Sequence, residues 1–334
     1  MKVAFFDTKS YDKIWFEPMM KEYKFKVKFF EHKLNPDTAA LTKGYDVVCI
    51  FVNDIADKRV IDTLCKNGVK LIALRCAGYN NVDFKAIPKS IKVVRVPAYS
   101  PSAVAEFTAA LLLTVNRKTH KAYIRTRDTN FNINGLLGFD LAGKTAGIIG
   151  TGKIGQMFID ICKGFHMKVI AYDPFPNKNL DVEYVSLDTL FEKSNIISLH
   201  CPLNADTHHI INEKTIEKMQ KNVFIINTSR GSLIDTTALI EGLKSKKIGG
   251  AGLDVYEEEG DVFFEDKSNE IVNDDELTRL LSFPNVVMSS HQGFFTKEAM
   301  QQIAMVTMEN IANFEQGKIT NEVVFDGEKI KEKN

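Results

Sequence analysis

Short apolar runs alternate along this chain with longer segments in which apolar side chains recur every three or four positions. Short runs are typical of buried parallel strands, and the longer periodicity is typical of amphipathic helices. The runs predict strands at 3–6, 26–30, 47–51, 71–74 and 93–94, and after Gly143 at 146–149, 169–171, 196–200, 223–227, 250–253 and 286–289. Strands that alternate with helices indicate an α/β fold in which helices cover both faces of parallel, doubly wound sheets.

One helix is unusually apolar. Residues 103–116 carry almost no charge, with Ser100 as a candidate N-cap and Pro101 at the first helical position. A helix that is apolar on most sides is buried on most sides, so we expect 103–116 to pack between domains or between subunits. The strongly charged residues 117–128 would be its exposed continuation.

The last helix, at about 296–315, predicts a return of the chain to its beginning. Its apolar face needs a partner, and we expect that partner among the first hundred residues. The residues that end the chain, 329–334, are mostly charged and are expected to fray.

Length, charge and hydropathy exclude several classes of protein. The 334 residues suffice for two domains of ordinary size, and the 43 basic side chains balance the 43 acidic ones. A neutral balance gives no reason to expect a nucleic-acid or membrane-surface partner. No apolar stretch approaches the ~18 residues of a membrane span, and the N-terminal run is too short for a signal peptide. We therefore expect a cytoplasmic protein.

Cysteine and histidine give no sign of a disulfide framework or of a metal site. The five cysteines, at 49, 65, 76, 162 and 201, form no Cys-x-x-Cys pair and are interpreted as reduced, mostly buried thiols. A catalytic role for the Cys201 thiol, which follows a predicted strand, is the less favoured alternative. His208 and His209 are adjacent, so in regular structure their rings would point apart, and we interpret them as surface histidines. We expect no metal.

The most informative segment is Gly150-Thr-Gly-Lys-Ile-Gly155, which follows a predicted strand and opens a helix. In such a fingerprint Gly150 permits the tight turn, Gly152 lets a pyrophosphate approach the backbone, and Gly155 lets helix and strand pack closely. The helix N-terminus offers N–H groups to the phosphates. The segment therefore predicts a dinucleotide site; the alternative is a glycine-rich turn with no cofactor.

Asp173 indicates which dinucleotide binds. It ends the next strand, 23 residues after Gly150, where a carboxylate can accept hydrogen bonds from the ribose hydroxyls of the adenosine. Its charge would repel a 2′-phosphate, and the Pro-Phe-Pro that follows supplies no arginine to neutralise one. The predicted cofactor is therefore NAD and not NADP.

Three side chains near later strand ends fit the chemistry of a nicotinamide enzyme, which must hold a substrate and supply a proton to its carbonyl oxygen. Arg230 follows the strand at 223–227, and its guanidinium can bind a carboxylate bidentately. His291 follows the strand at 286–289 and titrates in a suitable range. Glu259 can accept the second imidazole N–H. Taken singly, each has a structural alternative: a surface ion pair, a structural histidine or a solvated acidic loop.

These segments and several others, in this order, resemble those of the D-isomer-specific 2-hydroxyacid dehydrogenase family. The resemblance covers essentially the whole chain and rests on 75–83, the 150–155 fingerprint, His200-Cys-Pro202, Asn227-Thr-Ser-Arg-Gly231, 253–259 and His291-Gln292. Within the family the chain looks most similar to the fermentative NAD-dependent D-lactate dehydrogenases, on the segments 99–106, 145–155 and 262–269.

The resemblance implies two Rossmann-like domains that close over a cleft. A discontinuous substrate domain would comprise 1–100 plus 298–334, and an NAD-binding domain would comprise 101–297. Arg230 would bind the substrate, and Glu259 would pair with His291, the proton donor. The resemblance adds Ala77, Gly78, Tyr99 and Phe294 on the substrate side. On the cofactor side it adds Lys153, Ile154, Cys201, Pro202, Thr207, Thr228, Ser229, Arg230 and Asp254.

The implied reaction is the reversible reduction of pyruvate to D-lactate by NADH. Gly293 stands where an alanine is expected in close relatives and would loosen the pocket, whereas Tyr99 with Phe294 or Phe295 would suit a methyl side chain. Reduction of larger 2-keto acids, such as 2-ketoisocaproate or phenylpyruvate, is the alternative reaction. An NAD(H)-sensing corepressor is the alternative from another class. We expect a homodimer or homotetramer, with 103–116 as the interface.

Overall fold

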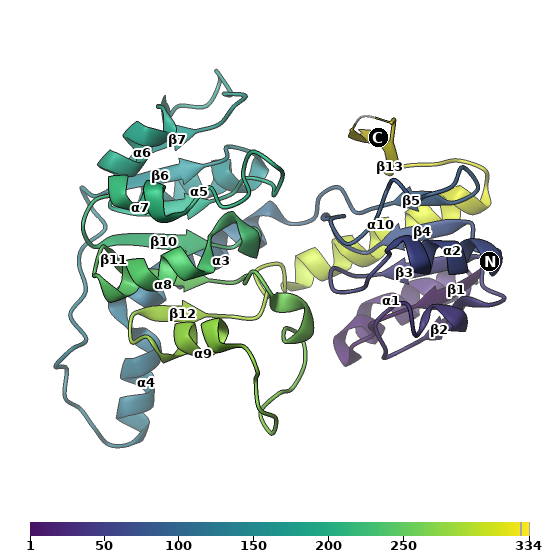
Figure 1. Cartoon of the computed structure of the whole chain (residues 1–334), viewed down its shortest axis with the longest axis horizontal. Coiled ribbons are helices and arrows are strands. Elements are labelled where there is room, and N and C mark those ends of the chain that lie inside the picture. The colour runs from purple at the N-terminus through teal and green to yellow at the C-terminus, as the bar shows by residue number, and fades with distance from the viewer. Residues whose placement is uncertain (328, 334) are drawn as a thin grey trace. The chain divides into compact units, whose positions relative to one another are not determined.

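The computed structural model describes residues 1–327 and 329–333, and the chain divides into two compact units. The first unit comprises Met1–Ser100 and Thr296–Asn334, and the second comprises Pro101–Phe295. Each unit contains one seven-stranded sheet flanked by helices (Figure 1). The expected α/β fold with two doubly wound parallel sheets is confirmed. The predicted second boundary, at 297/298, falls in the first turn of the last helix.

The first unit is built on β1 (Lys2–Phe5), β2 (Lys26–Phe29), β3 (Val47–Ile50), β4 (Leu71–Leu74), β5 (Lys92–Val94), β13 (Glu322–Phe325) and β14 (Ile330–Lys333). Their order is β14-β13-β5-β4-β3-β1-β2, and β1 to β5 run parallel. The helices are α1 (Ser10–Glu22), η1 (Ala39–Thr42), α2 (Lys58–Lys66) and α10 (Lys297–Glu315). The winding reverses between β1 and β3, because β2 lies on the far side of β1.

Helix α10 belongs to the first unit although it comes late in the chain. The Thr296 hydroxyl accepts a hydrogen bond from the Ala299 N–H and so caps the helix. Buried side chains of α10, among them Ile303 and Val306, lie on a helix that contacts α1 and β4. The apolar face that the sequence shows is therefore covered by elements from the first hundred residues.

The second unit is built on β6 (Thr145–Ile149), β7 (Lys168–Tyr172), β8 (Glu183–Tyr184), β9 (Ile196–Leu199), β10 (Val223–Asn227), β11 (Ile248–Leu253) and β12 (Val286–Met288). Their order is β12-β11-β10-β9-β6-β7-β8, all parallel, so the winding reverses between β6 and β9. This is the strand order of dinucleotide-binding Rossmann folds with one further strand at the edge.

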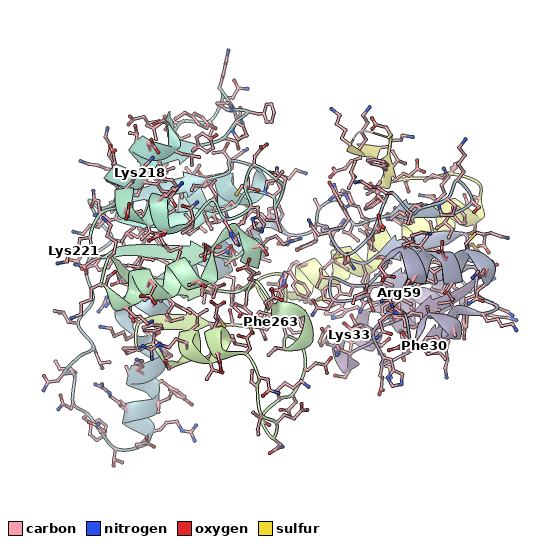
Figure 2. All side chains as sticks on the ribbon, in the orientation of Figure 1. Phe30, Lys33, Arg59, Lys218, Lys221 and Phe263 are labelled. Carbon is pink, nitrogen blue, oxygen red and sulfur yellow. The ribbon has the colours of Figure 1, made fainter. Side chains whose placement is uncertain are left out.

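Helices cover both faces of the second sheet. They are α3 (Pro101–Arg117), α4 (Thr119–Arg127), α5 (Lys153–Gly164), α6 (Leu187–Lys193), α7 (Glu213–Lys218), α8 (Thr236–Lys244) and α9 (Asp275–Ser282), with the short η2 (Gly231–Leu233) and η3 (Glu259–Asp261). Side chains of α3 and α5, such as Leu112 and Phe158, form one apolar core with the sheet. Side chains of α6 to α9 form another, which also buries Phe263 (labelled in Figure 2).

The burial of α3, which the sequence attributed to a contact between domains or subunits, comes from its own unit. The helix contacts α5, β10 and β11, and a Cβ on Gly252 of β11 would lie only 3.2 Å from the Leu111 Cβ. The charged segment 117–128 does not continue this helix. Lys118 has φ +52, and the chain restarts as the separate helix α4, which buries none of its side chains.

The expected fraying of the C-terminal residues is wrong for 330–333. These residues form β14, which pairs antiparallel with β13 and places Glu332 opposite Val323. All four side chains of β14 are exposed. The final residue, Asn334, lies outside the described residues. Within 1–327 and 329–333, no helix has both the length and the apolar character needed to cross a bilayer.

Candidate active site

The glycine-rich turn between β6 and α5 lies at the carboxyl end of the second sheet, at its reversal of winding. Gly150 has φ +95, and a Cβ there would lie 2.7 Å from the backbone of His200 and Cys201. A Cβ on Gly155 would lie 2.1 Å from the Gly150 carbonyl oxygen, so helix and strand meet backbone to backbone. A Cβ on Gly152 would meet nothing within 4 Å. The start of α5 is therefore accessible to a ligand.

Asp173 directly follows β7 and lies beside this turn. Its Oδ2 accepts hydrogen bonds from the N–H (2.7 Å) and the hydroxyl (3.0 Å) of Thr151, and its Oδ1 accepts one from the Phe175 N–H at 2.9 Å. The Tyr184 hydroxyl donates to the Thr151 hydroxyl at 3.0 Å. Sequence reasoning located Asp173 but missed Thr151, whose place between the first two glycines was the available signal. A carboxylate has about four acceptor sites, so one site, on Oδ1, remains for a ribose hydroxyl.

Arg230 lies between β10 and η2 and is half-buried. Its Nη1 donates to the Ser229 carbonyl oxygen at 2.7 Å. The Asn227 side chain holds the turn from both sides: its amide donates to the Arg230 carbonyl oxygen at 2.8 Å, and its Oδ1 accepts from the Ser229 N–H at 3.0 Å. A Cβ on Gly231 would lie 2.0 Å from the Tyr256 carbonyl group. The Arg230 turn thus packs directly on the loop that follows β11.

That loop carries Glu259, and the Glu259 carboxylate connects it to His291 after β12. Oε1 lies 2.8 Å from His291 Nδ1, and Oε2 accepts a hydrogen bond from the Tyr256 N–H at 3.1 Å. The two side chains are only 14% and 16% exposed, which strengthens a charge-assisted hydrogen bond. With Nδ1 bonded to the carboxylate, Nε2 is the ring nitrogen suited to proton transfer. The rings of Phe264 and Phe294 flank the imidazole at centroid distances of 6.0 and 6.4 Å.

Asp254 has a role that sequence reasoning missed, because its carboxylate holds the segment around His291. Oδ1 accepts hydrogen bonds from the Ser289 hydroxyl (2.7 Å) and the Gln292 N–H (2.8 Å), and Oδ2 accepts one from the Gly293 N–H at 2.7 Å. Burial raises the pKa of Asp254, and these donors oppose that shift. The only sequence signal was an acid at a strand end.

The expectation that Gly293 loosens the pocket is wrong. A Cβ on Gly293 would lie 2.9 Å from Asp254 Oδ2 and 3.4 Å from the Phe107 ring. The space that an alanine methyl would occupy is therefore already taken by side chains of the same unit. Gly293 permits the short contact between its own N–H and the Asp254 carboxylate.

The predicted cofactor residues beyond β9 and β10 are joined by hydrogen bonds. The Ser229 hydroxyl donates to the Cys201 carbonyl oxygen, and the Thr207 hydroxyl donates to the Pro202 carbonyl oxygen, at 2.7 and 2.6 Å. Burial raises the pKa of the Cys201 thiol to about 12, so a thiolate nucleophile at this position is not supported.

Three other predicted cofactor residues lie on helices or beside them. Lys153 is exposed and Ile154 is half-buried in the first turn of α5. The Thr228 hydroxyl is hydrogen-bonded to the Thr108 hydroxyl of the apolar helix α3 at 2.8 Å.

The predicted substrate residues Ala77, Gly78 and Tyr99 belong to the first unit and are half-buried. Ala77 and Gly78 follow β4. The Arg95 guanidinium donates to the Ala77 carbonyl oxygen at 2.6 Å, and the Cys76 thiol donates to that of Gly78 at 3.2 Å. Among the described residues, no backbone carbonyl accepts from the N–H of Ala77 or Gly78. Both N–H groups are therefore suited to an external anion.

The interpretation of His208 and His209 as side chains that point apart is wrong. Their rings stack with centroids 3.9 Å apart, and Glu257 joins them. A separate surface groove of about 770 Å³ runs along α7 and α8 and is lined by Glu213, Glu217, Lys221 (labelled in Figure 2), Thr237 and Glu241, among others. It contains none of the predicted catalytic or cofactor residues.

Comparison with known proteins gives consistent matches. Residues 109–293 match the family model of the D-isomer specific 2-hydroxyacid dehydrogenase, NAD binding domain. A 2-hydroxyacid dehydrogenase homolog of Haemophilus influenzae is 51% identical over 97% of this chain and 99% of its own length. The D-lactate dehydrogenase of Escherichia coli is 50% identical over 97% of this chain and 100% of its own length. The apo-structure of D-lactate dehydrogenase from Escherichia coli superposes with a TM-score of 0.86 and 48% identity, covering 95% of this chain and 98% of that one.

Proposed function

The chain belongs to the D-isomer-specific 2-hydroxyacid dehydrogenase family, and we propose that it is an NAD-dependent D-lactate dehydrogenase, which reduces pyruvate to D-lactate and runs in reverse. Residues 109–293, which match the family model of the NAD binding domain, lie within the second unit and support NAD as the cofactor. A relative named D-lactate dehydrogenase, half identical along the whole chain, supports the choice of substrate.

The hydrogen bond between His291 Nδ1 and Glu259 Oε1 is the observation that carries the proposal. Bound NADH supplies a hydride to the carbonyl carbon of the substrate. His291 then delivers the Nε2 proton to the carbonyl oxygen, and Glu259 stabilises the imidazolium form before that transfer. Phe264 and Phe294 limit the access of water to the imidazole.

Arg230 is proposed to bind the substrate carboxylate and to polarise the carbonyl through its guanidinium fork. The N–H groups of Ala77 and Gly78 would donate to the same carboxylate, and Tyr99 and Phe294 would contact the methyl group. These assignments rest on the family resemblance and on the backbone donors of Ala77 and Gly78 described above.

Gly150, Gly152 and Gly155 are proposed to hold the pyrophosphate at the start of α5, together with Lys153 and Ile154. Asp173 would bind the adenosine ribose and select NAD over NADP. Cys201, Pro202, Thr207, Thr228, Ser229 and Asp254 would line the rest of the dinucleotide. The open space around Gly152 and the remaining acceptor site of Asp173 fit these roles.

Steady-state kinetics test the proposal. We expect NADH oxidation with pyruvate, D-lactate as product, and a higher kcat/KM with NADH than with NADPH. A higher kcat/KM with 2-ketoisocaproate or phenylpyruvate than with pyruvate would instead identify an enzyme for larger 2-keto acids. Binding of NADH without turnover of any 2-keto acid would overturn the enzyme assignment in favour of a dinucleotide sensor.

The protein is further proposed to act in the cytoplasm as a homodimer or homotetramer. Helix α4 and the loop after it expose a set of large apolar side chains: Tyr123, Ile124, Phe131, Ile133 and Leu137, which are 57 to 87% exposed. Exposed apolar side chains at this density are typical of an interface between copies of a chain. Sedimentation of wild type and of Phe131→Ser checks this: loss of association in the variant is expected, and a monomeric wild type would contradict it.

A further inference from the structure

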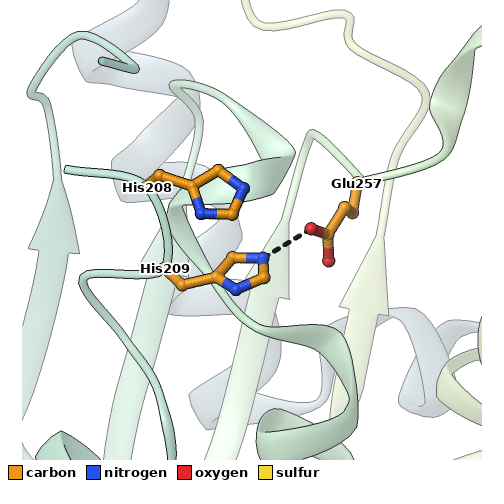
Figure 3. A group of neighbouring side chains, drawn as sticks. All are labelled: His208, His209 and Glu257. Atoms are coloured by element: carbon orange, nitrogen blue, oxygen red, sulfur yellow. Dashed lines mark hydrogen bonds and ion pairs between the residues drawn. The ribbon is translucent and has the colours of Figure 1, made fainter. Parts of the chain in front are cut away.

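The histidine pair at the end of the loop after β9 is not used by the proposed reaction. His209 has φ +50, a left-handed conformation that breaks the alternation of side chains along an extended chain. The rings of His208 and His209 therefore lie on the same side, with centroids 3.9 Å apart and planes at 28° (Figure 3).

Glu257 approaches this pair from the loop after β11 (Figure 3). Its Oε1 lies 2.5 Å from His209 Nε2, and its Oε2 accepts a hydrogen bond from the Thr236 hydroxyl at 3.1 Å. Nitrogen or oxygen atoms of His208, His209 and Glu257 that can ligate a metal all lie within 4.8 Å of one another. In the described part of the chain, this is the one group of three such residues that meets that condition.

We propose that His208, His209 and Glu257 bind a divalent cation of the zinc class: Zn²⁺, Co²⁺ or Ni²⁺. Two imidazoles with one carboxylate suit these ions, whereas Ca²⁺ and Mg²⁺ prefer ligand sets made of oxygen alone. With bonds of about 2.0–2.2 Å and tetrahedral angles, the ligand atoms lie about 3.4 Å apart. To reach that spacing, the His209 and Glu257 side chains move slightly apart and the exposed His208 ring turns. Water completes the fourth position.

The backbone around the ligands is fixed without an ion. The Asn204 side chain accepts a hydrogen bond from the Thr207 N–H at 3.1 Å, which closes the turn before the histidines. The His209 N–H donates to the Ser232 carbonyl oxygen at 2.9 Å, and the His209 carbonyl oxygen accepts from the Asn212 side chain at 2.7 Å. Such contacts orient metal ligands in advance and reduce the ordering that binding requires.

The location gives the site a mechanical role. The bound ion joins the loop after β9, which carries Thr207, to the loop after β11, two residues before Glu259. Because the assembled ligand set exists only in the folded chain, a bound ion makes the second unit more resistant to unfolding.

Isothermal titration of the metal-free, full-length protein with Zn²⁺, without nucleotide or substrate, tests the site. We expect one ion per chain. His208→Gln and Glu257→Gln should each weaken binding by more than ~10-fold, because each removes one ligand. His166→Gln is the matched control for His208→Gln, since His166 is also an exposed histidine and lies in the same unit. This control should bind Zn²⁺ as wild type does.

Co²⁺ supplies a second readout that separates this site from the His291–Glu259 pair. Visible absorption bands of bound Co²⁺ should appear with wild type and be lost in His208→Gln, a substitution of an exposed side chain that leaves folding intact. The proposal is overturned if wild type binds no Zn²⁺. It is also overturned if His208→Gln binds Zn²⁺ as tightly as wild type, because the ion would then lie elsewhere.

Discussion

The two sheets reverse their winding at equivalent places, between β1 and β3 and between β6 and β9. The residues that follow the strand ends near these places differ between the two units. Beyond the strand ends of the first unit lie Asp7, Asp54 and Arg75, which are at most 2% exposed. Beyond those of the second unit lie Gly152, which has open space around it, the half-buried Arg230 and the His291–Glu259 pair.

The contrast separates charges that support a fold from charges that are available for chemistry. The Arg75 guanidinium donates to the Asp7 carbonyl oxygen at 2.8 Å, lies 3.7 Å from Asp12, and stacks over the rings of Phe5 and Phe51. The guanidinium group is enclosed within the unit, where Arg75 is only 2% exposed. A charged residue at a strand end therefore indicates a ligand site only where its side chain is still accessible to a ligand.

Loss of the proton donor in the second unit should have the largest effect. Asparagine tolerates the left-handed backbone of His291 (φ +53) but carries no titratable proton, so His291→Asn should lower kcat/KM for pyruvate by ~10²–10⁴. The midpoint of thermal unfolding and the affinity for NADH should change little. His166→Asn, at φ +58, is the control for the backbone and should keep full activity. A near-normal rate in His291→Asn would assign the proton to another group.

Loss of the buried arginine of the first unit should act on stability. Arg75→Met leaves the carboxylates of Asp12 and Asp54 buried without their cation, which should lower the free energy of unfolding by about 3–5 kcal/mol. Urea denaturation measures this loss. Arg59→Met is the control, because Arg59 (labelled in Figure 2) pairs with Asp57 at an exposed position and should contribute less than about 1 kcal/mol. Equal effects of the two substitutions would contradict the structural role of Arg75.

A change from arginine to lysine at position 230 sharpens the comparison. Lysine keeps the charge but loses the bidentate fork, so Arg230→Lys should lower kcat/KM by about 10- to 100-fold, the value of one charge-assisted hydrogen bond. The free energy of unfolding should stay close to that of wild type, since Arg230 is half-buried. If stability falls and kinetics do not, Arg230 resembles Arg75 and does not contact the substrate.

A further effect concerns the pH dependence of stability in the first unit. Burial raises the pKa of the Asp54 carboxyl to about 7, against the opposing influence of Arg75 and of the N–H groups of Phe51 and Leu34. In the unfolded chain an aspartate titrates near ~3.9. The folded state therefore retains a proton that the unfolded state has released, and the free energy of unfolding falls as the pH rises from about 4 to about 7.

Asp54→Asn removes this titration. Urea denaturation across that range should show the stability of the variant improving relative to wild type as the pH rises, with no further change above about pH 7. A constant difference between the two proteins across the window would show that Asp54 stays ionised in the folded protein.

Much of the fold follows from the sequence, because buried strands and amphipathic helices require apolar side chains at characteristic spacings. Strand β14 left no such pattern. Its side chains are all exposed and all but Ile330 are charged, and the backbone hydrogen bonds to β13 that hold it have no signature in composition. The apolar character of α3 predicted burial but not its partner, because the hydrophobic effect is non-directional and any apolar surface can cover the helix.

The site was predictable where chemistry demands one residue type at one position. Glycine at 150 and the His291–Glu259 pair belong to that class. Thr151 and the structural role of Asp254 were not recognised, because many side chains can satisfy a hydrogen bond and the contact depends on the folded backbone. His208 and His209 were misjudged for the same reason: a single left-handed residue changes which way a ring points, and the sequence does not state φ.

The membership of α10, β13 and β14 in the first unit has a consequence for synthesis on the ribosome. Residues 101–295 form an uninterrupted stretch and can complete their sheet as soon as they emerge. The amino-terminal hundred residues emerge earlier, yet they lack the helix that covers β4 and the two strands beyond β5 until translation ends. The part of the protein that is made first is therefore the part that matures last.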